Sequence, residues 1–276
     1  AVLIVKSQLQ NFLKRRISLG ERRLLMQSAG SLQISGIVKL LKRILKGTAI
    51  VEGAGAILLA FVFCPKMGFL PGIWNAIFHS VSAFCNAGFD LMGKYGQFSA
   101  LSSEGLQFNP IVNFTIMALI VTGGIGFLVW TDVSRHKLDF KKYELHSKIA
   151  LFTTALLLVL GTILFFIFEY NKAFGDFTFG QKLLASMFQA VTPRTAGFNT
   201  IDEATLSESG KALTTVLMFI GGSPGSTAGG IKTTTFAVLV LSALAAAKRY
   251  GSVTVFKRKL DENTIVQASS ILSVYL

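Results

Sequence analysis

The segment Phe78-His-Ser-Val-Ser-Ala-Phe-Cys-Asn-Ala-Gly-Phe89 returns in altered form as Phe188-Gln-Ala-Val-Thr-Pro-Arg-Thr-Ala-Gly-Phe198. The glycines of the two Ala-Gly-Phe motifs, Gly88 and Gly197, are 109 residues apart. Each copy follows one apolar run and precedes another, and the later run carries a double glycine in both cases. Because self-similarity at a fixed period indicates repeated structural units, the sequence predicts two copies of one unit.

The apolar runs around this repeat are long enough to cross a membrane. A helix needs about 20 apolar residues, at about 1.5 Å each, to span a hydrocarbon core of about 30 Å. Runs of this kind occupy residues 47–64, 111–131, 149–168 and, with interruptions, 212–247. Trp74–Phe84 and Leu183–Val191 are apolar but too short to cross, so we expect half-helices that enter the membrane and return. The predicted fold is an all-α membrane protein of repeated helix–pore loop–helix units, with a broken inner helix in the second visible unit.

The predicted organisation has four parts. An end of a preceding unit and a basic cytoplasmic segment occupy residues 1–46, and the start of a following unit occupies residues 264–276. The first full unit, 47–148, has a helix at 47–64, a pore loop at 71–90, a helix at 111–131 and a cytoplasmic loop. The second, 149–263, has a helix at 149–168, a pore loop at 180–200, a broken helix at 212–247 and a cytoplasmic loop. Because both ends resemble interrupted helices, we expect the chain to be the middle of a longer protein.

The net charge of +13 is distributed in alternation along the chain. Residues 6–46 hold ten basic residues (Lys or Arg) and one Glu. Residues 131–148 hold five basic and three acidic residues, and residues 248–263 hold five basic and two acidic residues. Residues 65–110 and 169–211 are close to neutral. This alternation follows the positive-inside rule and places the basic segments in the cytoplasm of a multi-pass protein of the cell membrane, with lipid as a partner. It argues against nucleic acid as a partner, because the basic runs sit beside membrane spans.

The two glycine loops are the candidate ion-binding residues. A dehydrated monovalent cation needs several oxygens at once, and backbone carbonyls supply them without fixed charge. Glycine adopts most cheaply the backbone angles that turn successive carbonyls to one axis, and the C-terminal end of a preceding half-helix favours cations. A glycine turn that only packs between helices is the alternative for a single loop, and the repeat favours the pore. The predicted filter consists of Asn86, Ala87, Gly88 and Phe89 together with Thr195, Ala196, Gly197 and Phe198.

A second candidate segment, Gly221-Gly-Ser-Pro-Gly-Ser-Thr-Ala-Gly-Gly-Ile-Lys232, interrupts the last apolar run. Its glycines and Pro224 cannot hold a regular helix, so we expect two helical pieces joined by a flexible intramembrane loop. Such breaks mark an ion path or a moving part, and a close-packed glycine face is the alternative. Lys232 either faces the pore or pairs with a carboxylate, and Arg194 either binds backbone carbonyls or reaches outer water. The predicted gating residues are Gly221, Gly222, Ser223, Gly225, Ser226, Thr227, Gly229, Gly230 and Lys232.

These three motifs resemble the Trk/Ktr/HKT superfamily of potassium transporters, and most closely the membrane subunit of bacterial Ktr-type uptake systems. The resemblance runs through essentially the whole chain. It implies four successive units around one pore, of which this chain holds the second and third, and it makes residues 219–234 similar to the family's intramembrane gating loop. It also implies a pair of membrane chains above a cytosolic ring of nucleotide-binding regulatory subunits.

The functional prediction is potassium uptake through a channel-like pore, without a cofactor. Sodium is left open as a coupling or stimulating ion. The alternatives are a sodium- or proton-coupled potassium symporter and an inactive membrane scaffold. The sequence shows no Ser/His/Asp, Cys/His or paired-carboxylate arrangement and no metal site beyond potassium at the filter, so it predicts that the protein is not an enzyme.

Overall fold

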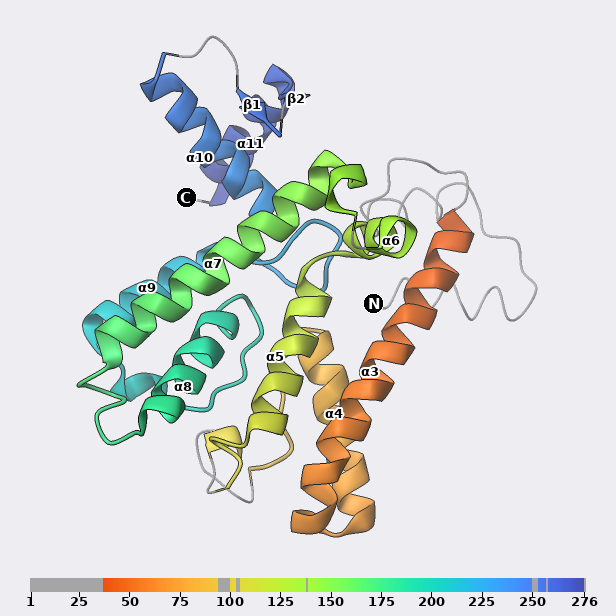
Figure 1. Ribbon diagram of the computed structural model, residues 1–276, viewed down its shortest axis with the longest axis vertical. Helices are drawn as coiled ribbons and strands as arrows, with labels where there is room; N and C mark the ends of the chain where they lie inside the picture. The colour runs from red at the N-terminus through yellow and green to blue at the C-terminus, as the bar shows by residue number, and fades with distance from the viewer. Residues whose placement is uncertain are drawn as a thin grey trace. The chain divides into compact units, whose positions relative to one another are not determined.

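The computed structural model describes residues 37–93, 100–102, 105–137, 139–249, 253–256 and 258–275 (Figure 1). Residues 1–36 of the predicted opening segment lie outside the described residues. The chain divides into two compact units, residues 1–51 and 52–276. The described part of the first unit is helical and forms the beginning of α3 (Ile37–Met67). The second unit contains the rest of α3 and all of the other described elements.

The first repeat follows the predicted order. The long helix α3 ends near Gly68, whose φ of 88° is costly for other residues, and the half-helix α4 (Phe69–Phe84) follows at once. The two helices approach closely, because a Cβ placed on Gly72 would lie 2.5 Å from the Cα of Cys64. A short 3-10 turn (Ala100–Ser102) leads to α5 (Pro110–Gly124), which packs against α4.

The second repeat has the same order of elements. The outer helix α7 (Leu145–Glu169) is followed by the half-helix α8 (Phe179–Val191), a 3-10 turn (Glu203–Thr205) and α9 (Glu208–Phe219). The predicted broken helix continues as α10 (Thr233–Ala247) after a non-helical segment. α8 packs against α7 and α9 of its own repeat and against α5 of the other (Figure 1). The two half-helices are thus brought together by α5.

Two of the helices are long and apolar enough to cross a membrane within the described part of the chain. They are Leu41–Met67 and Leu145–Glu169, and a third span is obtained if α5 is counted together with the helix that follows it. Many large apolar side chains on α3 and α7 are exposed, including Phe61 and Ile167, as expected for helices that face lipid or further helices.

The predicted single helix over 111–131 is wrong. The chain forms α5, then α6 (Phe127–His136), with a bend of 97° between the two. The bend occurs at Gly126, whose φ is 92° and whose Cβ, if present, would lie 2.5 Å from the carbonyl oxygen of Pro224. The backbone N–H of Phe127 donates to the carbonyl of Gly225 at 2.9 Å instead of continuing the helix. The segment after α9 therefore packs directly against the bend.

The segments predicted to be cytoplasmic contain small elements that the sequence did not predict. A 3-10 turn (Phe140–Lys142) precedes α7, and β1 (Thr254–Val255) pairs antiparallel with β2 (Arg258–Lys259) after α10. The last helix, α11 (Glu262–Tyr275), packs against α10. Val253, Leu260 and Ala268 form a small buried cluster with residues of α10, which holds these elements together.

Glu169, at the end of α7, is fully buried and anchors the beginning of α9. Its carboxylate accepts hydrogen bonds from the Ser207 hydroxyl at 2.5 Å and from the Ser207 N–H at 3.2 Å. A Cβ on Gly210 would lie 2.2 Å from the same carboxylate, so the helix start fits closely around it. The negative charge also lies at the positive end of the α9 dipole.

We expect Glu169→Gln to destabilise the protein by about 1–3 kcal/mol, because the amide turns a donor toward groups that need an acceptor. The measurement is the thermal unfolding midpoint of the purified protein in detergent. The matched control is Glu208→Gln, which changes an exposed carboxylate on the first turn of the same helix. Equal midpoints for the two variants would contradict the anchoring role.

Candidate functional site

The two predicted filter loops have the same backbone conformation. Each begins where a half-helix ends, α4 at Phe84 and α8 at Val191. Asn86 and Thr195 both have positive φ, 50° and 64°, and two residues later Gly88 and Gly197 have φ of 72° and 79°. Left-handed angles at the same two positions of both loops require glycine at one of them and tolerate a polar residue at the other. The repeat seen in the sequence is therefore a repeat of geometry.

The two loops touch each other. A Cβ on Gly88 would lie 2.6 Å from the carbonyl oxygen of Ala196 and 2.8 Å from the Cα of Gly197. The side-chain amide of Asn86 donates to the carbonyl of Arg194 at 3.4 Å. The structure thus brings together the filter residues that the sequence predicted in each repeat, and it does so through backbone contacts that only glycine permits.

The predicted gating segment is a folded, hydrogen-bonded loop and not a flexible link. We call it the hairpin for its shape, although Ile220 and Ile231 at its two ends pair in a parallel bridge. The N–H groups of Gly221 and Gly222 donate to the carbonyls of Ile231 and Gly229, both at 3.1 Å. A Cβ on Gly221 would lie 1.8 Å from the Gly229 oxygen, so the two strands of the hairpin meet at glycines. The glycines therefore allow close backbone pairing here, which fixes the loop.

This hairpin, residues 221–232, packs against both filter loops. The Thr227 hydroxyl donates to the carbonyl of Phe84 at 2.9 Å, at the end of the first half-helix. The Gly229 N–H donates to the Thr195 hydroxyl at 2.8 Å in the second loop. Side-chain and backbone bonds therefore join the hairpin to each repeat at the base of its loop.

The double glycine of α5 completes the seat of the hairpin. The carbonyls of Gly123 and Gly124 accept hydrogen bonds from the N–H groups of Thr227 at 3.2 Å and Ser223 at 2.8 Å. A Cβ on Gly123 would lie 2.0 Å from the carbonyl of Phe84, which leaves no room for a side chain. A small cavity remains between these elements, lined by Asn86, Ile120, Val121, Gly124, Val191, Arg194, Gly222 and Ala228.

Two cations near the loops, the buried Arg194 and the half-buried Lys232, contact backbone oxygens. Arg194 is 4% exposed, and its guanidinium lies 3.4 Å from the Thr154 hydroxyl and 3.5 Å from the Gly221 carbonyl. Its side chain thus contacts the hairpin, through the Gly221 carbonyl. The Lys232 ammonium donates to the carbonyl of Ala228 at 2.8 Å, within the hairpin. Among the described residues neither cation forms an ion pair with a carboxylate.

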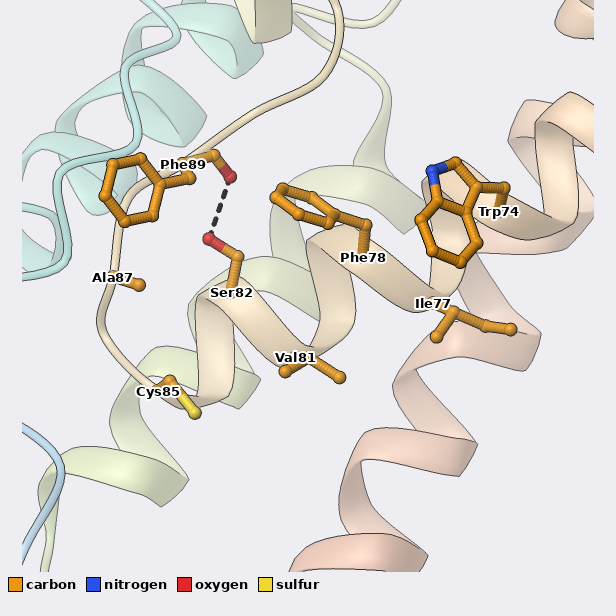
Figure 2. Close-up of a pocket in the computed structure, with 8 residues that line it drawn as sticks. All are labelled: Trp74, Ile77, Phe78, Val81, Ser82, Cys85, Ala87 and Phe89. Atoms are coloured by element: carbon orange, nitrogen blue, oxygen red, sulfur yellow. Dashed lines mark hydrogen bonds between the residues drawn. The ribbon is translucent and has the colours of Figure 1, made fainter. Parts of the chain in front are cut away.

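Sequence reasoning missed two hydroxyls at the ends of the half-helices. Ser82 and Thr192 donate to carbonyls of the loops that follow them. The signal was present, because Val81-Ser82 and Val191-Thr192 align when the two segments are superposed from Phe78 and Phe188. Figure 2 shows the Ser82 hydroxyl directed toward the Phe89 carbonyl. Ser82 lines a largely apolar pocket of about 300 Å³, which Trp74 also lines.

Residues 2–276 match the family described as TrkH, cation transport protein. The chain is 42% identical to the potassium/sodium uptake protein NtpJ of Enterococcus hirae over 265 residues, which cover 95% of this chain and 57% of that protein. It is 37% identical to the Ktr system potassium uptake protein B of Bacillus subtilis over 273 residues, 98% of this chain and 58% of that protein. The chain thus spans less than two thirds of the length of these relatives.

The fold has a counterpart among solved structures. The crystal structure of the potassium transporter TrkH from Vibrio parahaemolyticus superposes with a TM-score of 0.72 at 20% identity and covers 92% of this chain and 52% of that one. This similarity extends over both repeats and supports the helix–pore loop–helix architecture. With a family match over nearly all of its residues, the chain belongs to the TrkH family of cation transport proteins, which are multi-pass membrane transporters and not enzymes.

Proposed function

We propose that this chain forms part of a potassium uptake pore, in which residues 86–89 and 195–198 contribute half of a carbonyl filter. The observation that carries the proposal is the contact of Gly88 with Gly197, with the same positive φ in both loops. Two loops that meet at glycine and follow the C-terminal ends of two half-helices present partial negative charge to one region. The potassium named for the relatives from Enterococcus hirae and Bacillus subtilis agrees with this site.

The hairpin 221–232 is proposed as the gate of this pore. It is joined to the end of the first half-helix through Thr227 and to the second loop through Thr195. A segment held there by hydrogen bonds obstructs the space next to the loops and opens only when those bonds exchange for others. Transport through the open pore is passive, since each unit charge that crosses 100 mV inward gains about 2.3 kcal/mol.

The partners of the chain follow from its surfaces and relatives. Two loops cannot surround an ion, so the remaining filter segments must come from a longer chain or a second copy. We propose a homodimer embedded in lipid, with a cytosolic nucleotide-binding ring below it, on the basis of the resemblance to Ktr-type uptake systems. Two of the relatives are named as potassium uptake proteins of such a system. The basic residues between α6 and α7, among them Lys141 and Lys142, are exposed and suit contact with that ring or with anionic headgroups.

The test is rubidium uptake in cells that lack their own potassium uptake, with the 276-residue chain compared with its reading frame extended at both ends. We expect uptake by the extended form, because four filter segments are then available. Uptake by the short form would mean that two chains supply two segments each. The absence of uptake from both forms, when both are inserted in the membrane, would contradict the proposal and favour a scaffold.

The same assay separates passive flux from coupled transport. The name of the Enterococcus hirae relative includes sodium, so the measurement is made with and without external sodium. Passive potassium flux predicts rubidium uptake that continues without sodium and follows the membrane potential. Uptake that stops without sodium would support the symporter alternative.

A further inference from the structure

Ser82 is hydrogen-bonded to the first filter loop at two points. It lies in the last turn of α4 and is buried. Its carbonyl accepts a hydrogen bond from the N–H of Ala87 at 2.9 Å, and its hydroxyl donates to the carbonyl of Phe89 at 2.8 Å (Figure 2). The hydrogen bonds of Ser82 therefore close the loop that carries the carbonyls of Asn86, Ala87 and Gly88.

Thr192 does the same for the second loop. It caps the C-terminal end of α8 and is buried. Its carbonyl accepts from the N–H of Ala196 at 3.0 Å, and its hydroxyl donates to the carbonyl of Phe198. In both repeats, a hydroxyl at the equivalent position near the end of the half-helix donates to the carbonyl of the phenylalanine in the Ala-Gly-Phe motif.

The bonding of these two hydroxyls differs from the usual behaviour of serine and threonine in helices. Most such hydroxyls bond back to the carbonyl four residues earlier, as Ser186 does to Lys182 at 2.7 Å in the same half-helix. The loops also differ in length, because Ala87 is five residues after Ser82 and Ala196 is four after Thr192. The bond to the phenylalanine carbonyl is kept in spite of this difference, so it is a feature of the loop geometry and not of local spacing.

We propose that Ser82 and Thr192 are positioning residues that set the ion selectivity of the two filter loops. The inference rests on the proposed function of the loops. A carbonyl site discriminates between potassium and the smaller sodium only while its oxygens keep their number and spacing. A hydroxyl bond at the outer end and an N–H bond in the middle restrain the loop against closing on a smaller ion. Loss of the hydroxyl leaves the pore open but lets the oxygens move.

The experiment measures rubidium and sodium uptake by Ser82→Ala, Thr192→Val and the double variant, in whichever form of the chain supports uptake. We expect each single variant to lower the rubidium-to-sodium ratio about fivefold, the factor that corresponds to one neutral hydrogen bond. The double variant is expected to lower it further. Rubidium uptake itself is expected to change less than the ratio, which a purely structural defect would not produce.

Matched controls lie in the same half-helices. Ser80→Ala removes a buried hydroxyl that donates to the Glu52 carbonyl at 2.6 Å, and Ser186→Ala removes one that bonds to its own helix. Neither hydroxyl touches a filter loop, so the ratio should stay at the wild-type value. Ser82→Thr and Thr192→Ser keep the donor and should restore selectivity.

Two results overturn the inference or its basis. An unchanged ratio in Ser82→Ala and Thr192→Val, beside a selective wild type, would refute the role of the hydroxyls and leave the filter in place. If Ser82→Ala does not reach the membrane, Ser82→Cys takes its place beside Thr192→Val. Both substitutions nearly keep the side-chain volume, and the hydroxyl donor is weakened in Ser82→Cys and removed in Thr192→Val. A wild-type protein that shows no selective uptake would instead refute the filter itself.

Discussion

Serine in place of Gly88 should abolish selective uptake while leaving the protein in the membrane. The new Cβ would meet the Ala196 carbonyl at 2.6 Å and the Gly197 Cα at 2.8 Å, both of them backbone atoms of the other loop. Overpacking of this kind costs about 1–3 kcal/mol, and the left-handed φ of 72° adds about 1–2 kcal/mol for a residue with a side chain. The loops must separate, so we expect the rubidium-to-sodium uptake ratio to fall by at least about tenfold.

Two other glycines separate the clash from the backbone strain. Gly68→Ser introduces a side chain at a φ of 88°, but its Cβ would meet only Pro71, at 4.0 Å. This variant should keep the wild-type rubidium-to-sodium uptake ratio. Gly197→Ser should lower the ratio less than Gly88→Ser, because its Cβ would lie 3.2 Å from the nearest atom, the Gly88 Cα. Wild-type selectivity in both Gly88→Ser and Gly197→Ser would remove the filter assignment.

Shortening residues 222–230 should raise the rate of rubidium uptake several-fold, since the hairpin fills the space beside the loops. The more conservative change is Thr227→Val, which removes the hydroxyl that donates to the Phe84 carbonyl at 2.9 Å and keeps the side-chain shape. Loss of one neutral hydrogen bond should shift the equilibrium between the closed and the open hairpin about fivefold toward the open state. The initial rate of uptake at fixed membrane potential, divided by the amount of protein in the membrane, measures the effect.

The control for the hairpin is Thr215→Val in α9, because the Thr215 hydroxyl bonds to the carbonyl of Lys211 in its own helix at 3.0 Å. It should leave the rate unchanged. If the shortened hairpin and Thr227→Val both give unchanged or abolished uptake in a folded protein, the segment does not obstruct the path. It would then serve only to support the loops.

The features that the sequence predicted correctly are those with a local signature. The glycine loops and the short half-helices are readable because each needs particular residues within one stretch of chain. The bend after Gly124 was not predicted, since the residues around it are apolar and the cause is a hydrogen bond from Phe127 to Gly225 of another repeat. The fixed hairpin was missed for the same reason, as its partners are Phe84, Gly124 and Thr195.

Buried polar groups show a second kind of limit. The sequence indicated that Arg194 was notable but left two partners open, and only packing places it on the Gly221 carbonyl. Glu169 drew no attention because it follows directly after the predicted span 149–168 and has no recognisable partner nearby in the sequence. Its burial depends on Ser207, 38 residues later. Position in the sequence cannot supply such contacts, because they depend on which surfaces the helices share.

The contact between the two loops also has a consequence for biosynthesis. Gly88 meets Gly197 only after 109 further residues have been made, and the Phe84 carbonyl must wait for Thr227, which is 143 residues away. Contacts of such long separation form late and leave earlier segments incomplete while the ribosome works. The first loop therefore passes through the insertion machinery without its partners, and its final shape is reached only when the last helices of the second repeat have entered the bilayer.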